Sequence, residues 1–129
     1  MLRANEEIGN PNNPAMTIPA TKTLIIFDKF FSTSKIREVM VHEIAHIAAW
    51  DIDPIILKSF FLARDWKYQE AGKIISPAKT LISDSKLSPS EDFANSVELY
   101  YSDRHRLKNF NLKSFQILKE IIKTKESNK

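Results

Sequence analysis

The spacing of apolar residues predicts one strand followed by several helices. Residues 23–27 read Thr-Leu-Ile-Ile-Phe, a β-branched and apolar run with polar flanks, which is typical of a strand. Residues 35–50 then carry apolar side chains around most of a helix circumference, from Ile36 to Ala48. A helix that is apolar on most sides belongs in the middle of a fold. The Ser-Thr-Ser cluster at 32–34 offers oxygens for its N-cap.

Three later segments carry the start signals or the apolar stripe of a helix. Asp53 and Pro54 supply an N-cap and a first helical proline, and Ser88 and Pro89 do the same for a helix over 88–101. In the helix that begins at Pro54 we expect four inward residues, Ile56, Leu57, Phe60 and Phe61. A last helix over 111–125 has its apolar residues on one face, namely Leu112, Phe115, Leu118, Ile121 and Ile122.

Two segments lack a clear period. Residues 1–20 contain Asn-Pro-Asn-Asn-Pro at 10–14 and a further proline, so we expect an irregular lead-in with little regular structure. Residues 65–87 mix apolar residues with Gly72 and Pro77, which predicts a loop with short elements. The pattern as a whole predicts an α+β, mostly helical domain over residues 21–129.

Composition narrows the kinds of site that the chain can form. The sequence has 129 residues, which suit one domain, and no cysteine, so any metal ligands must be His, Asp or Glu. No apolar run approaches the ~20 residues that span a bilayer. The net charge of +3 comes with lysines that are spaced along the last third, so we expect no nucleic-acid partner. The first 14 residues show no apolar leader core, which leaves open a cytoplasmic protein or a secreted one whose leader was removed.

The strongest chemical signal is His42-Glu43-Ile44-Ala45-His46. Residues four apart on a helix project from the same side, so both imidazoles can bind one ion. Zinc accepts imidazole nitrogen, and a hydrolytic zinc site keeps a position open beside three protein ligands. Glu43 is then placed to act as a general base toward an attacking water. The competing interpretation is two hydrogen-bonded core histidines and a surface acid, which would put three polar groups on an apolar helix without a purpose.

A third ligand has to come from elsewhere in the chain. The metzincin continuation fails because Ala49 and Ile52 stand where glycine and histidine would be. Four later carboxylates are candidates: Glu70, Glu91, Asp92 and Glu98. Glu91 is favoured because it begins a helix and shares a face with Asn95, which could hold one of the histidine rings by a hydrogen bond. Its alternative role is to complete a capping box with Ser88.

Four stretches together resemble the catalytic domain of lethal-factor-like zinc peptidases, which belong to the gluzincin group. They are Val-His-Glu-Ile-Ala-His at 41–46, Glu-Asp-Phe-Ala-Asn-Ser-Val-Glu-Leu-Tyr at 91–100, and Arg-Leu-Lys at 106–108 with Ser-Phe-Gln at 114–116. The likeness covers about residues 23–125, and its first motif is the specific one. The resemblance implies a zincin-like fold in which His42, His46 and Glu91 bind Zn²⁺ and Glu43 is the general base.

The chain also departs from that family. The family has an acid where Asn95 stands, and similar enzymes have a tyrosine just before the third ligand that stabilises the oxyanion. Residues 80–90 contain no tyrosine, which leaves four substitutes as candidates: Tyr68, Tyr100, Tyr101 and His105. One clear strand ahead of the metal-binding helix indicates a small, reduced sheet, or a chain that is part of a longer protein.

The sequence thus predicts a zinc-dependent peptidase or amidase that acts on a protein or peptide substrate. A zincin-fold module that keeps metal for stability and binds a partner through its basic helical side is the main alternative. Metallopeptidases that cleave phage repressors share the first motif as well. They usually follow the third ligand with an apolar run ending in Met-Pro, which residues 99–102, Leu-Tyr-Tyr-Ser, do not supply.

Overall fold

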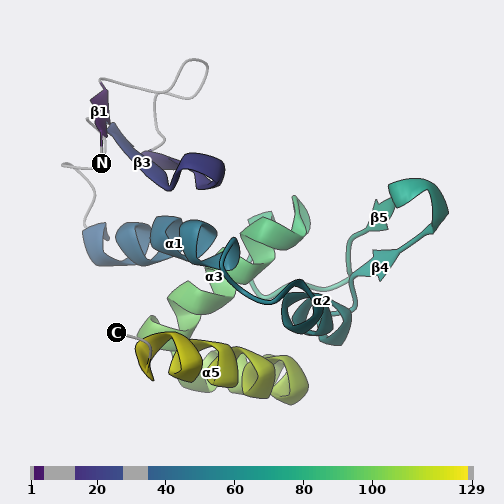
Figure 1. The fold of residues 1–129 in the computed structure, drawn as a ribbon. Coiled ribbons are helices and arrows are strands. Elements are labelled where there is room, and N and C mark those ends of the chain that lie inside the picture. Colours follow the sequence, from purple (N-terminus) through teal and green to yellow (C-terminus); the bar gives the residue numbers. More distant parts are fainter. Residues whose placement is uncertain (1, 5–13, 28–34, 128–129) are drawn as a thin grey trace. The chain divides into compact units, whose positions relative to one another are not determined.

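The computed structural model describes residues 2–4, 14–27 and 35–127, and the chain divides into two compact units, 1–51 and 52–129 (Figure 1). The first unit holds a small sheet and one α-helix, and the second holds the remaining α-helices and a hairpin. None of the helices in the described ranges combines the length and the apolar character that a membrane span requires.

The sheet of the first unit has the strand order β1-β3-β2. β3 (Thr23–Phe27) is the predicted strand and lies in the centre, with β1 (Leu2–Ala4) parallel to it and β2 (Ala15–Ile18) antiparallel. A 3₁₀ turn, η1 (Pro19–Thr21), joins β2 to β3. The expectation of an irregular lead-in over residues 1–20 is therefore wrong for the described residues. The two strands are three and four residues long, too short to show a period, and they exist through backbone pairing with β3.

α1 (Ile36–Ala49) packs on one face of this sheet. Leu24 and Ile26 alternate along β3 and so point to the same face, where they form a buried cluster with Ala15 of β2. Val39 and Met40 of α1 pack against that cluster. The helix predicted over 35–50 is confirmed, and its second turn packs on the sheet that precedes it.

The expected burial of α1 on most of its sides is not observed. Ala45 is the buried residue of this helix, and Ile44 is 50% exposed. The apolar pattern shows which sides of a helix carry apolar residues. It does not show how many neighbouring elements cover those sides. The N-cap position belongs to Lys35, whose side chain makes no capping hydrogen bond, and residues 32–34 lie outside the described residues.

The second unit is built from α2 (Pro54–Ala63), α3 (Pro89–Ser102), α4 (Arg104–Phe110) and α5 (Leu112–Ser127). α2, α3 and α5 confirm the three predicted helices, whereas α4 was not predicted. Each pair α2 and α5, α3 and α4, and α4 and α5 packs together. The largest fully buried apolar side chains of this unit are Phe60, Phe93, Leu107 and Leu118. The rings of Phe60 and Phe93 meet edge to face with their centroids 5.7 Å apart.

Local caps explain where these helices begin. The Asp53 side chain accepts a hydrogen bond from the Ile55 amide, and the Ser88 hydroxyl accepts one from the Glu91 amide, as the sequence predicts. Two of the expected inward residues are exposed instead, Ile56 at 45% and Leu112 at 51%. Both lie in the first turn of their helix, at the margin of the apolar stripe, where the neighbouring helix no longer covers them.

Residues 65–87 form a loop with short elements, as predicted. β4 (Lys67–Tyr68) and β5 (Ile74–Ile75) make a small antiparallel hairpin around the 3₁₀ turn η3 (Glu70–Gly72), and all four strand residues are exposed. A second 3₁₀ turn, η4 (Ser83–Lys86), packs against α3. η4 therefore supports the helix that carries the candidate third ligand.

Candidate metal centre

His42 and His46 come together on α1. Their Nε2 atoms are 3.3 Å apart, and both side chains are half-buried. The ring centroids are 4.9 Å apart with the planes at 77°, so the rings meet edge to face. Two zinc–nitrogen bonds of about 2.0–2.1 Å at a tetrahedral angle place their nitrogens about 3.3–3.4 Å apart. The separation fits a pair of zinc ligands, and it equally suits an N–H···N hydrogen bond between neutral rings.

Glu43 is held by Thr17, a residue that no motif in the sequence singles out. The Thr17 hydroxyl donates to the carboxylate oxygen Oε2 of Glu43, and it lies 3.1 Å from the Glu43 backbone oxygen. Thr17 belongs to β2, two residues after Ala15, so both side chains point to the face of the sheet that α1 covers. The alternation along β2 is the signal that could have found Thr17, had the strand been recognised.

Glu91 lies in the first turn of α3 and is half-buried. Its backbone amide donates to the Ser88 hydroxyl at 3.1 Å, which confirms the predicted N-cap. An acidic residue in the first turn also interacts favourably with the helix dipole. Glu91 belongs to the second unit and the two histidines belong to the first, so its role as the third metal ligand stays a prediction.

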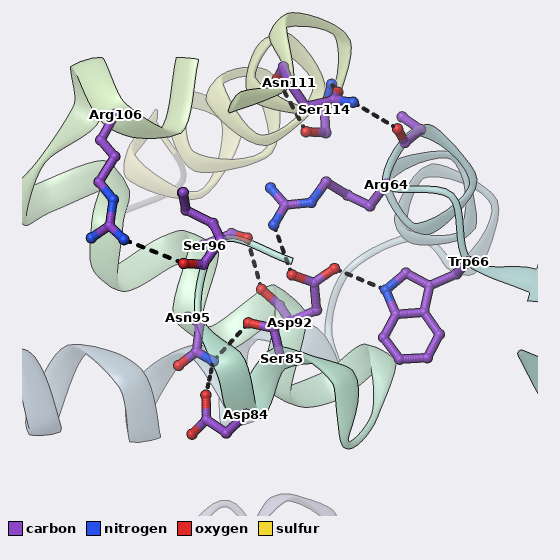
Figure 2. Close-up of polar contacts among 12 residues, drawn as sticks. Arg64, Trp66, Asp84, Ser85, Asp92, Asn95, Ser96, Arg106, Asn111 and Ser114 are labelled. Carbon is purple, nitrogen blue, oxygen red and sulfur yellow. Dashed lines mark hydrogen bonds and ion pairs between the residues drawn. The ribbon is translucent and has the colours of Figure 1, made fainter. Parts of the chain in front are cut away.

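Asp92 is occupied by other partners. Its Oδ1 accepts from Arg64 Nη2 at 2.8 Å, and its Oδ2 accepts from Trp66 Nε1 at 2.8 Å (Figure 2). Burial raises the pKa of Asp92, against the attraction of Arg64 and the hydrogen bonds, and burial likewise lowers the pKa of Arg64. With both oxygens engaged inside the second unit, Asp92 is not available to a metal. Trp66 is buried, and its indole nitrogen donates the hydrogen bond to Asp92.

The amide nitrogen of Asn95 is committed to η4. It donates to Asp84 Oδ1 at 2.7 Å and to Ser85 Oγ at 2.9 Å, using both of its hydrogens (Figure 2). Asn95 and Ser85 are both buried. The predicted hydrogen bond to a histidine ring could therefore involve only the side-chain oxygen of Asn95.

The remaining carboxylate candidates differ in their surroundings. Glu70 is exposed in the turn of the hairpin, and Glu98 is half-buried two turns after Glu91 on α3. A hairpin whose strand residues are all exposed gives Glu70 little support of the kind that fixes a metal ligand. Glu98 stays an alternative to Glu91.

The four candidates for oxyanion stabilisation all lie in the second unit, and two of them, Tyr100 and Tyr101, meet edge to face with their ring centroids 5.3 Å apart. Tyr100 is buried, with the guanidinium carbon of Arg104 4.0 Å from its ring centroid and Phe115 stacked at 6.1 Å, so its ring is part of the packed core. The Tyr101 hydroxyl donates to Glu126 on α5. Tyr68 lies in the hairpin under Lys58, and His105 is exposed next to Asn109. The described contacts of these residues identify none of them as an oxyanion donor.

Comparison of the chain with known proteins finds no matching family model, no matching curated protein and no matching solved structure. The resemblance to lethal-factor-like peptidases therefore rests on the sequence motifs. What the fold adds is the local arrangement of the two histidines, Glu43 and Thr17 within the first unit.

Proposed function

We propose that the protein is a zinc-dependent peptidase, or an amidase that acts on a related bond. In this proposal His42, His46 and Glu91 hold the ion, and Glu43 is the general base. The observation that carries it is the 3.3 Å separation of the two histidine Nε2 atoms on one half-buried helix face. Two imidazoles and one carboxylate are a known ligand set of catalytic zinc, and a chain without cysteine has no thiolate to offer instead.

Glu91 is the best supported third ligand among the later carboxylates. Both carboxylate oxygens of Asp92 already accept hydrogen bonds from Arg64 and Trp66, and Glu70 lies in the turn of an exposed hairpin. Glu91 is half-buried, and its backbone is fixed by the Ser88 cap. A ligand on a capped helical turn is held more firmly than one on a loop, which is what a metal site needs.

The chemistry follows from these roles. Bound zinc supplies a Lewis acid that polarises water and the scissile carbonyl. Glu43 takes a proton from the attacking water while the new carbon–oxygen bond forms, and it passes that proton to the amine as the carbon–nitrogen bond breaks. The Thr17 hydroxyl holds the Glu43 carboxylate during this transfer.

Metal content and cleavage test the proposal together. Zinc-replete protein, dialysed and analysed by atomic emission, should retain one zinc per chain, and His46→Ala should retain none. A mixed peptide library analysed by mass spectrometry should show cleavage by the native protein. Glu43→Gln should keep the zinc and lose the cleavage, since the base is removed and the ligands remain.

Two results would overturn parts of this proposal separately. A native protein without stoichiometric zinc would exclude the metal site and the enzyme with it. Stoichiometric zinc without cleavage of any peptide, and with Glu43→Gln indistinguishable from the native protein, would instead indicate a metal-stabilised binding module. Among the ligands, Glu91→Gln should weaken zinc binding, and the matched variants Glu98→Gln and Glu70→Gln should not.

A further inference from the structure

Asp92, next to the proposed ligand Glu91, is the centre of a buried polar cluster. Asp92 is 0% exposed, Arg64 is 4% exposed and Trp66 is 3% exposed. Arg64 is the C-cap residue of α2 and Trp66 follows two residues later, so one segment of chain supplies both donors to a carboxylate of α3. Figure 2 shows the two donors approaching the two oxygens of Asp92 from different directions.

The surroundings of this cluster are largely aromatic. The guanidinium carbon of Arg64 lies 4.9 Å from the ring centroid of Phe110 and 5.7 Å from that of Phe60. Arg64 Nη1 is buried and has no hydrogen-bond partner among the described residues. The ion pair is thus enclosed by apolar groups, where removal of two charges from water is costly.

The cluster is a weak source of stability. Burial is the largest influence on both charged groups, raising the pKa of Asp92 and lowering the pKa of Arg64 despite their mutual attraction. Buried ion pairs can often be replaced by well-packed apolar residues without loss of stability. Apolar residues would not hold the side chain at position 92 in one orientation. A carboxylate with a fixed hydrogen-bond donor on each oxygen cannot rotate.

The fixed orientation of the Asp92 side chain also constrains the orientation of Glu91. The Glu91 amide is bonded to Ser88, and the next side chain along the helix is locked in the cluster. Successive side chains on a helix are about 100° apart, so an inward Asp92 turns Glu91 toward the half-buried rim of α3. Together with the buried Phe93 and Asn95, Asp92 therefore helps to set the rotation of the first turns of α3.

We propose that Asp92, held by Arg64 and Trp66, is a positioning residue that aims Glu91 at the metal. The inference rests on the proposed function, since it concerns the third ligand of that site. Asp92 does not touch the ion; its effect on the metal runs through the orientation of its neighbour.

Two variants test this role with zinc affinity and a cobalt spectrum as readouts. Trp66→Phe keeps a buried ring and removes one donor to Asp92. The double variant Arg64→Met, Asp92→Leu replaces the ion pair by apolar groups. Zinc affinity, measured by competition with a chelator, should fall about 10- to 100-fold in each, as for other residues that orient metal ligands. The visible absorption of the Co²⁺-substituted protein should change in intensity, because the carboxylate ligand is displaced.

Tyr101→Phe is the matched control, since it removes a hydrogen bond made by the C-terminal half of α3. It should leave zinc affinity and the cobalt spectrum as in the native protein. If Trp66→Phe has the zinc affinity and the cobalt spectrum of the native protein, the inference is overturned. If the double variant does not fold, the result for Trp66→Phe alone tests the inference. His46→Ala separates the two proposals. If this variant binds zinc like the native protein, the proposed function fails. If it loses zinc, the metal site stands, and the Trp66→Phe result then bears on the positioning role alone.

Discussion

The Thr17 hydroxyl on β2 is hydrogen-bonded to the carboxylate of Glu43 on α1. The two residues are 26 positions apart, and the sheet brings them together because Ala15 and Thr17 share the face on which α1 packs. A hydroxyl has one proton, and a charged oxygen is a stronger acceptor than a backbone carbonyl. Thr17 therefore orients the side chain of Glu43 rather than its backbone.

If the proposed peptidase site is correct, Thr17→Val should slow turnover without removing the metal. Valine keeps the β-branched shape on the strand and lacks the hydroxyl, so Glu43 loses the contact that orients it. The fall in kcat should stay within the roughly 10²–10⁴-fold that a general base contributes. Peptide cleavage and zinc content measured on the same preparation check this, with Thr17→Ser as the control that keeps the hydroxyl. An unchanged kcat in Thr17→Val would show that Glu43 needs no such support.

Asn95→Asp, which introduces the acid that lethal-factor-like peptidases carry in the resembling motif, should destabilise this protein. The amide nitrogen of Asn95 donates to the Asp84 carboxylate at 2.7 Å, so the substitution would set two carboxylates against each other. Loss of the donor in a buried position should lower the free energy of unfolding by about 1–3 kcal/mol at neutral pH. Urea denaturation measures the change.

The exchanged pair provides the control for that experiment. In Asn95→Asp with Asp84→Asn, an amide again faces a carboxylate at the same contact, so most of the lost stability should return. A double variant as unstable as Asn95→Asp would mean that the partner of Asn95 in solution is not Asp84. The contact with Asp84 also gives a physical reason why this chain carries an amide at position 95.

The fold was predictable where the signal is local. Asp53 with Pro54, and Ser88 with Pro89, mark the starts of α2 and α3, and both aspartate and serine act as caps in the structure. β1 and β2 were missed because their residues become strands only by pairing with β3. α4 was missed because its seven residues hold one fully buried side chain, Leu107, although the Asp103 cap ahead of it was a readable start signal.

The residues of the candidate site also divide into those that local spacing predicts and those that depend on contacts between distant segments. His42 and His46 are about one turn apart on one helix, with Glu43 next to the first of them, so their spacing is enough to bring the rings together. The role of Thr17 could not be predicted from the sequence, because its contact with Glu43 depends on the pairing of strands. Arg64 and Trp66 reach Asp92 across 28 and 26 positions, and no spacing rule connects a helix C-cap to the first turn of a later helix.

Phe93→Ala should strongly destabilise the second unit. The Phe93 ring is 2% exposed and meets Phe60 edge to face, so its removal leaves a cavity between α2 and α3. Truncation of a buried phenylalanine costs about 3–5 kcal/mol of unfolding free energy. Leu87→Ala in the same unit is the control, because Leu87 is 77% exposed and its truncation should cost no more than about 0.5 kcal/mol. Equal urea midpoints for the two variants would contradict the packing described for this core.

Zinc should raise the melting temperature if the proposed ligands hold it. A ligand that binds only the folded protein stabilises it by about 2.7 kcal/mol at a free concentration of 100 times its Kd. For a chain of this size that corresponds to a rise of roughly 10 °C, measured by calorimetry before and after removal of zinc by a chelator. Glu43→Gln should show the same rise, since the base is not a ligand, whereas His42→Ala and His46→Ala should show none. A rise that survives in both histidine variants would mean that the zinc sits elsewhere on the protein, and the 3.3 Å approach of the two rings would then be an ordinary hydrogen bond.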